Sequence, residues 1–104
     1  MNAFEVLAEP TRRRILDLVR DDERSVGELV DNLAMSQPAV SKHLRVLRDE
    51  GFVEARVDGQ RRLYHVRAAP LAEVEAWLEP YRRLWGERLD RLAQHLEQTS
   101  DKEG

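Results

Sequence analysis

A predicted helix over residues 37–50 keeps its polar side chains apart from its apolar ones. At 100° per residue, Ser41, Lys42 and Arg45 project opposite an apolar stripe. Gln bonds bidentately to adenine, Arg and Lys bond to guanine, and Ser bonds to several base edges, so these residue types suit a helix in the major groove of DNA. The stripe consists of Val40, Leu44 and Leu47, and the opposite side consists of Gln37, Pro38, Ser41, Lys42 and Arg45.

Two capped helices joined by a short turn are predicted to position this surface. Ser36 has the residue type of an N-cap for the polar helix, and Gly51 stands where a left-handed C-cap is expected. Residues 25–28, with the sequence Ser-Val-Gly-Glu, form a capping box that starts a shorter helix of two to three turns. Residues 34–36 then separate the two helices, which is the spacing of a helix-turn-helix motif.

A further helix over residues 10–21 is predicted before this motif. Pro10 suits the first turn of a helix, and the apolar positions that follow recur at i, i+3 and i+4. Arg12, Arg13 and Arg14 lie in its first turns and have acidic neighbours on both sides. We interpret them as surface arginines that pair with those acids.

Residues 52–67 are predicted to form a β-hairpin that serves as a wing. The segments 52–57 and 61–67 have strand-like composition, and Asp58-Gly59 between them is a strong turn signal. A two-residue loop gives the hairpin an inward face that consists of Val53, Ala55, Tyr64 and Val66. Basic side chains at the far end, together with helix N-terminal amides, can hold DNA phosphates. These wing residues are Arg56, Arg61 and Arg62.

The charge of the chain is concentrated in the same region. Residues 36–67 carry 7 basic against 4 acidic side chains, a net charge of +3, although the whole chain has a net charge of −3. Such a basic centre between acidic flanks is expected of a module that presents one face to a polyanion. The alternative, a polar solvent-facing helix beside a surface hairpin, accounts less well for the ordered series of caps, turn, glycine and basic hairpin.

The C-terminal part of the chain has a long amphipathic pattern, in which apolar residues recur every three or four positions from Leu71 to Leu96. Pro80 falls inside the pattern and predicts either a kink or two consecutive helices. A small-ligand pocket is one use for this surface, but isolated amphipathic helices usually pack on a partner, so we favour a homodimer. A two-fold dimer predicts an inverted-repeat operator. The predicted interface consists of Phe4, Leu7, Trp77, Tyr81, Leu84, Trp85, Leu89 and Leu92.

Composition excludes several other classes of protein. With 104 residues and no cysteine, the chain is one domain's worth of material without disulfides or thiolate metal sites. The three histidines lack ligand spacing, and no constellation of catalytic residues is found, so we expect no metal, no cofactor and no enzyme activity. No segment resembles a membrane span or a signal peptide, which predicts a cytoplasmic protein. We expect a single domain over residues 1–97 and a flexible tail over residues 98–104.

Several motifs in order resemble the ArsR/SmtB family of winged helix-turn-helix repressors. They are the segments 9–16 (EPTRRRIL), 25–29 (SVGEL), 36–47 (SQPAVSKHLRVL), 51–53 (GFV) and 59–64 (GQRRLY). The resemblance implies a mainly α fold with a small β-hairpin, dimerisation through the terminal helices, and repression, often of the repressor's own operon. It places the DNA-reading positions on Gln37, Ser41, Lys42 and Arg45. The full set predicted to contact DNA is Ser36, Gln37, Pro38, Ser41, Lys42, His43, Arg45, Arg56, Arg61 and Arg62.

The chain departs from the metal-sensing members of that family. Where they have Cys-x-Cys in the helix before the recognition helix, this chain has Ser25-Val26-Gly27, and its last helical segment has only His95 followed by Glu97. The predicted type is therefore a cysteine-free repressor with no metal and with no inducer specified by the sequence. Two alternatives stay open, namely a metal-responsive repressor that uses His and carboxylate ligands and a winged-helix module for protein–protein interaction.

Overall fold

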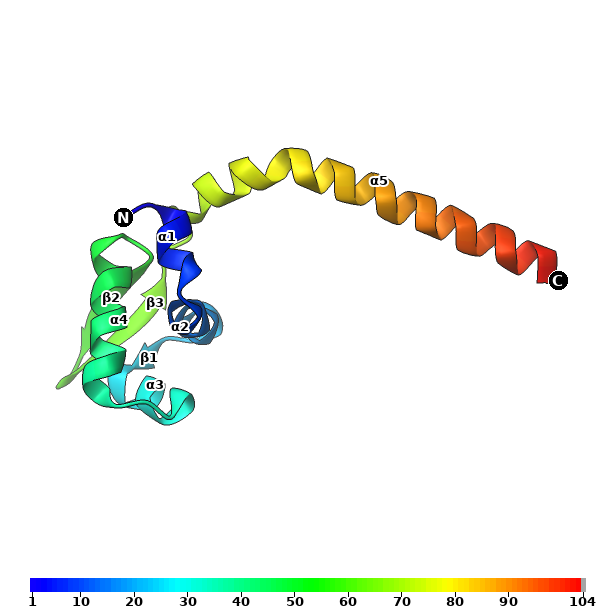
Figure 1. Cartoon of the computed structure of the whole chain (residues 1–104). Coiled ribbons are helices and arrows are strands. Elements are labelled where there is room, and N and C mark those ends of the chain that lie inside the picture. Colours follow the sequence, from blue (N-terminus) through cyan, green and yellow to red (C-terminus); the bar gives the residue numbers. More distant parts are fainter. Residues whose placement is uncertain (104) are drawn as a thin grey trace. The chain divides into compact units, whose positions relative to one another are not determined.

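The computed structural model describes the backbone of residues 1–103 and the side chains of residues 1–98. The chain is mainly helical with a small antiparallel sheet, as the sequence predicts (Figure 1). It forms two compact units, Met1–Val74 and Glu75–Gly104. The elements are α1 (Ala3–Ala8), α2 (Pro10–Asp21), β1 (Arg24–Ser25), α3 (Val26–Leu33), α4 (Gln37–Asp49), β2 (Val53–Asp58), β3 (Arg61–Val66) and α5 (Leu71–Glu103).

Side-chain caps define where α3 and α4 begin. The amide of Glu28 donates to Ser25 Oγ at 3.2 Å, and the Ser25 amide donates to Glu28 Oε1 at 3.3 Å, so the predicted capping box is confirmed. Ser36 Oγ accepts from the Ala39 amide at 3.3 Å and starts α4. The turn between the two helices includes Ala34 with a φ of 53°, a left-handed conformation that a non-glycine residue adopts uncommonly.

Two glycines allow the chain to reverse direction after α4. Gly51 has a φ of 78° directly after the C-cap Glu50, as the sequence predicts for a helix that stops there. Gly59 has a φ of 66° in the hairpin loop. Because Asp58 pairs with Arg61, the two-residue loop is 59–60 rather than 58–59, and β2 extends one residue further than predicted.

The sheet has the strand order β1-β3-β2. Val53 lies opposite Val66, and Ala55 lies opposite Tyr64, so the predicted inward face of the hairpin is confirmed. The short strand β1, which the sequence did not predict, pairs with β3 through Arg24 and Tyr64. It ties the start of α3 to the hairpin.

A single buried cluster lies at the centre of the first unit. It is assembled from α1, α2, α3, α4 and the inward face of the hairpin. Burying this much aliphatic and aromatic surface is the main stabilising contribution of the unit. Its side chains are Ala3, Val6, Ile15, Leu16, Val19, Leu29, Leu33, Val40, Leu44, Leu47, Phe52, Val53 and Tyr64.

The arginines at the start of α2 bind α1 rather than acids. Arg12 Nε donates to the Val6 carbonyl at 2.7 Å, and Arg13 Nη1 donates to the Leu7 carbonyl at 2.6 Å. The last carbonyls of a helix have no hydrogen-bond donor within the helix. At the end of α1, two guanidinium groups donate to these carbonyls. Neither arginine forms an ion pair with a described acid, so the predicted ion pairs are wrong, and Arg12 acts on the nearby Glu9 only electrostatically.

Helix α5 continues through Pro80 as one element, so the alternative of two separate helices is wrong. It reaches Glu103 and thus extends beyond residue 97, where the sequence predicts the domain to end. The predicted flexible tail covers residues 98–104. Its side chains from residue 99 onward lie outside the described residues, as does the whole of Gly104.

Candidate nucleic-acid interface

The core holds α4 so that one side of the helix faces outward. Val40, Leu44 and Leu47 have at most 2% of their surface exposed. The residues predicted on the opposite side are all exposed, which confirms the helical projection. They are Gln37, Pro38, Ser41, Lys42 and Arg45.

Two further residues on α4 or at its start were predicted to contact DNA, but they are not simply exposed side chains like the five above. The hydroxyl of Ser36 is exposed but already accepts the Ala39 amide as the helix cap. His43 is half-buried on the flank of α4, where it interacts electrostatically with Glu9. The pKa of Glu9 lies below its usual value, chiefly because the Thr11 amide donates to its carboxylate and also because His43 and Arg12 are near.

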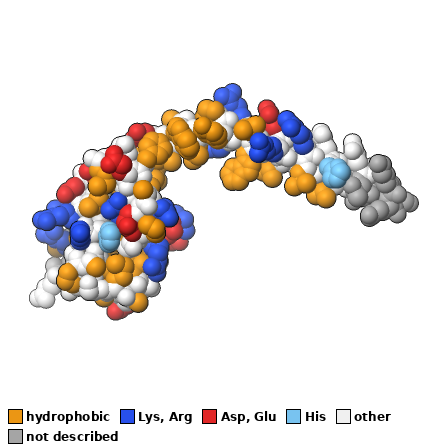
Figure 2. Space-filling model, in the orientation of Figure 1, with side chains coloured by type: hydrophobic (Ala, Val, Ile, Leu, Met, Phe, Trp, Pro, Cys, Tyr) orange, Lys and Arg blue, Asp and Glu red, His pale blue; other side chains and the backbone are white. Residues whose placement is uncertain are grey.

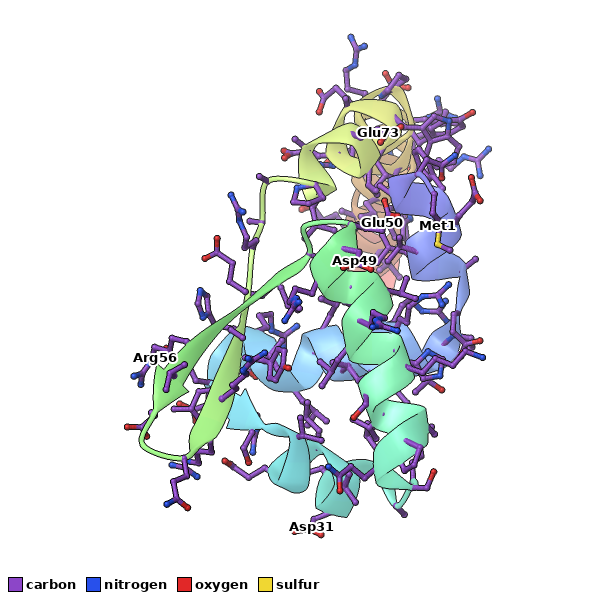
Figure 3. The ribbon with its side chains drawn as sticks, turned by 90° about the vertical axis from the view of Figure 1, so that its left-hand side faces the viewer. Met1, Asp31, Asp49, Glu50, Arg56 and Glu73 are labelled. Carbon is purple, nitrogen blue, oxygen red and sulfur yellow. The ribbon has the colours of Figure 1, made fainter. Side chains whose placement is uncertain are left out.

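The three arginines predicted for the wing fall into two groups. Arg56 Nε contacts Glu23 Oε2 at 2.6 Å, and Arg61 lies 3.6 Å from both Glu28 and Asp58, so carboxylates neutralise both guanidinium groups. Figure 3 shows Arg56 on the outer strand β2. Arg62 is exposed and forms no ion pair in the described part of the chain.

A hollow between α4 and β3 includes residues that sequence reasoning missed. It has a volume of about 200 Å³ and is lined by Ser41, Leu44, Arg45, Arg48 and Tyr64. Arg48 follows Ser41 and Arg45 at the i, i+4, i+7 spacing of one helix face, and this spacing is the signal that could have found it. Tyr64 was predicted only as a core residue because it faces inward from the hairpin.

Figure 2 shows Lys and Arg side chains at several places on the first unit, among them the part that carries α4 and β2, with Asp and Glu side chains between them. At the opposite end of α4 from Ser36, the carboxylate of Glu50 is turned to the N-terminal amine of Met1, at 3.6 Å (Figure 3). The middle of α4 exposes the cations Lys42, Arg45 and Arg48, and its C-terminal end exposes the acid Asp49.

Within the second unit, α5 presents an exposed apolar face (Figure 2). Trp85 has 69% of its surface exposed, and the Trp77 and Tyr81 rings pack together with centroids 4.9 Å apart. A hollow of about 350 Å³ on this face is lined by Trp77, Leu78, Tyr81, Leu84, Trp85 and Arg88. Of the other residues predicted for a dimer interface, Leu89 and Leu92 extend this face, whereas Phe4 and Leu7 belong to the first unit, where Leu7 packs on the core.

Other kinds of site are not found in the described part of the chain. No three His, Asp or Glu side chains there are arranged to hold a metal ion. His65 Nε2 lies 3.2 Å from Glu54, which also pairs with Arg67 at 3.0 Å, and this group has only two potential ligands. The described helices include none that is long and apolar enough to cross a membrane.

Comparison with known proteins identifies the family of this chain. The family model for "Bacterial regulatory protein, arsR family" matches residues 9–55, which contain α2, α3 and α4. The HTH-type transcriptional regulator Rv2034 of Mycobacterium tuberculosis is 36% identical over 99 residues, which cover 95% of this chain and 90% of that protein. The transcriptional repressor SdpR of Bacillus subtilis is 29% identical over 77 residues, 74% of this chain and 86% of that one.

A solved structure with a similar fold is the homodimeric winged helix-turn-helix DNA-binding domain of Mb0332 from Mycobacterium bovis. It is 30% identical, covers 76% of this chain and 73% of its own, and superposes with a TM-score of 0.61. The predicted winged helix-turn-helix fold is thus confirmed. Together with the outward face of α4, these matches show that the chain belongs to the arsR family of bacterial regulatory proteins and is a DNA-binding transcriptional regulator, not an enzyme.

Proposed function

We propose that the chain is a dimeric repressor that acts in the cytoplasm and binds an inverted-repeat operator near its own gene. In this proposal α4 lies in the major groove, and the hairpin formed by β2 and β3 contacts the DNA backbone. Repression is the activity named for the relative SdpR, and homodimerisation is the state named for the Mb0332 domain.

The observation that carries the proposal is the division of α4 into two sides. Its apolar side is buried, so the orientation of the helix in the unit is fixed by packing. Its exposed side begins with Gln37 and continues through Ser41 and Arg45, which are spaced one helical turn apart. These side chains can donate to, and Gln and Ser can also accept from, the base edges of the major groove.

For the wing, the proposal includes Arg62 and leaves out Arg56 and Arg61. A guanidinium held by a carboxylate must first break that contact to reach a phosphate, whereas Arg62 contacts no carboxylate among the described side chains. Lys42, which is exposed on α4 and forms no ion pair within residues 1–98, adds a second cation on the same side as Arg45.

Dimerisation is proposed through the apolar face of α5. Trp77, Tyr81 and Trp85 each expose more than half of their surface, although large aromatic side chains gain most when they are buried. A patch of this kind on a described helix is typical of a protein–protein interface. A second copy of the chain offers the same patch, which is what a two-fold interface requires.

Fluorescence anisotropy tests the proposal with the DNA immediately upstream of this protein's own gene, against a shuffled duplex of equal composition at 0.15 M salt. We expect the native fragment to bind tighter by more than ~10³. Equal weak binding to both duplexes would contradict an operator at this position. Absence of binding to either duplex would favour a protein-interaction module instead.

A further inference from the structure

The hollow between α4 and β3 is lined by hydrogen-bond donors that have no acceptor. Ser41 and Tyr64 each contribute a hydroxyl, and Arg45 and Arg48 each contribute a guanidinium. None of these four side chains forms a hydrogen bond or an ion pair in the described part of the chain. Leu44 forms the floor and is buried in the core.

The fold holds these donors in place from two directions. Ser41, Arg45 and Arg48 are spaced along one face of α4, which the core fixes. Tyr64 has only 8% of its surface exposed, and its strand β3 is paired on both edges, with β1 and with β2. Arg62 lies two residues before Tyr64 on the same side of β3, so a further unpaired cation continues the row along the inner side of the hairpin.

Ser41 and Arg45 are assigned to base edges in the proposed function, and the other donors of this set, Arg48 and Tyr64, fit a phosphodiester better than a base. A phosphate group offers only acceptors and carries a negative charge, whereas base edges are neutral and those of adenine and cytosine present a donor in the major groove. The guanidinium of Arg48, which forms no ion pair with a described carboxylate, favours an anion, and Arg in particular binds phosphate oxygens in pairs.

We propose that this hollow seats one phosphate of the DNA backbone, and that Arg48 and Tyr64 are positioning residues that set how deeply α4 enters the major groove. The inference rests on the proposed binding of DNA through α4. It assigns the backbone contact to Arg48 on α4 and to the inner side of the hairpin, with Tyr64 and Arg62 on β3, and not to the acid-paired Arg56 and Arg61.

The test measures the salt dependence of DNA binding for three variants of the full chain. Arg48→Ala should weaken binding equally on the operator and on a shuffled duplex and should reduce the slope of log K against log salt by ~0.9, the value for one lost phosphate contact. Tyr64→Phe should weaken binding without changing the slope, because the phenol is neutral. Arg56→Ala is the matched control, since it removes the same charge from the wing, and it should leave the slope unchanged.

A modified duplex identifies the contact itself. Replacing the phosphates one at a time by neutral methylphosphonates should reveal one position at which wild-type protein loses affinity and Arg48→Ala loses no more. An unchanged slope for Arg48→Ala, or an equal change for Arg56→Ala, would overturn the inference while leaving DNA binding by α4 intact. If wild-type protein binds neither duplex, the proposed function fails first, so the two failures are distinguishable.

Discussion

The helices α4 and α5 are both amphipathic, yet they leave opposite kinds of surface exposed. In α4 the apolar residues are covered by the rest of its unit, and the polar side faces outward. In α5 the apolar residues from Trp77 to Leu96 expose between 37% and 69% of their surface. A hydrophobic pattern therefore indicates folding in one helix and association in the other, and only the surroundings of each helix distinguish the two uses.

The largest effect that separates the two helices is expected from matched leucine truncations. Leu47→Ala in α4 should lower the free energy of unfolding by about 2–5 kcal/mol, because the side chain is fully buried and a cavity is left behind. Leu89→Ala in α5, which removes the same atoms from a side chain 56% exposed, should cost less than about 1 kcal/mol at low protein concentration. Urea denaturation of both variants measures the difference, and equal losses would remove the distinction between the two helices.

The second effect concerns association. Trp85→Ala should raise the dissociation constant of the dimer by about 30-fold or more, since a truncated aromatic anchor at the centre of an interface costs ~2 kcal/mol or more. Sedimentation equilibrium measures the constant. Arg83→Ala, an exposed residue on the other side of α5, is the control and should leave it unchanged. A monomeric wild-type protein at every concentration would contradict dimerisation through this face.

Where signals are local, the sequence was sufficient to predict the fold. Ser25 fixes the start of α3, and Ser36 and Gly51 fix the two ends of α4, through contacts within a few residues, so these boundaries were correct. The strand β1 has only two residues and is defined by its pairing with β3, some forty positions away in the sequence. No local sequence pattern therefore predicts this strand. The same holds for the hydrogen bonds from Arg12 to α1, which depend on how two helices meet.

The candidate site divides in the same way. The exposed side of α4 follows from helical periodicity alone, because the period decides which residues lie opposite the core. The state of the wing arginines does not, because Glu23 and Glu28 come from segments distant in sequence and reach Arg56 and Arg61 only in the folded chain. Arg48 and Tyr64 meet across two elements, and their donors become a set only through tertiary packing.

A smaller effect should sharpen the assignment of the polar side of α4. Arg45→Ala should cost about 1–3 kcal/mol in operator binding and should relax the sequence preference at one base pair, if the guanidinium bonds to a base edge. Competition binding with single-base operator variants measures the preference. Arg20→Ala removes an exposed arginine of α2 that pairs with Asp17 and Asp21, and this control should change neither affinity nor preference. A uniform loss on all sequences would make Arg45 a phosphate contact.

The smallest expected effect is a pH dependence at the start of α3. The pKa of Glu28 lies below its usual value of 4.5, chiefly because the Ser25 amide donates to its carboxylate, and then because of the Ser25 hydroxyl. A carboxyl whose pKa is lowered on folding stabilises the protein above its unfolded pKa, and this contribution is lost as the pH falls through the lowered value. Unfolding midpoints of wild-type protein and Glu28→Gln should therefore differ at pH 7, and the difference should shrink as the pH falls from about 4.5 through the lowered pKa of Glu28. Asp31→Asn, on the same helix but outside the cap, controls for the general loss of a negative charge. If the difference in unfolding midpoint between wild-type protein and Glu28→Gln stayed the same at low pH, the charge of Glu28 would take no part in holding the capping box.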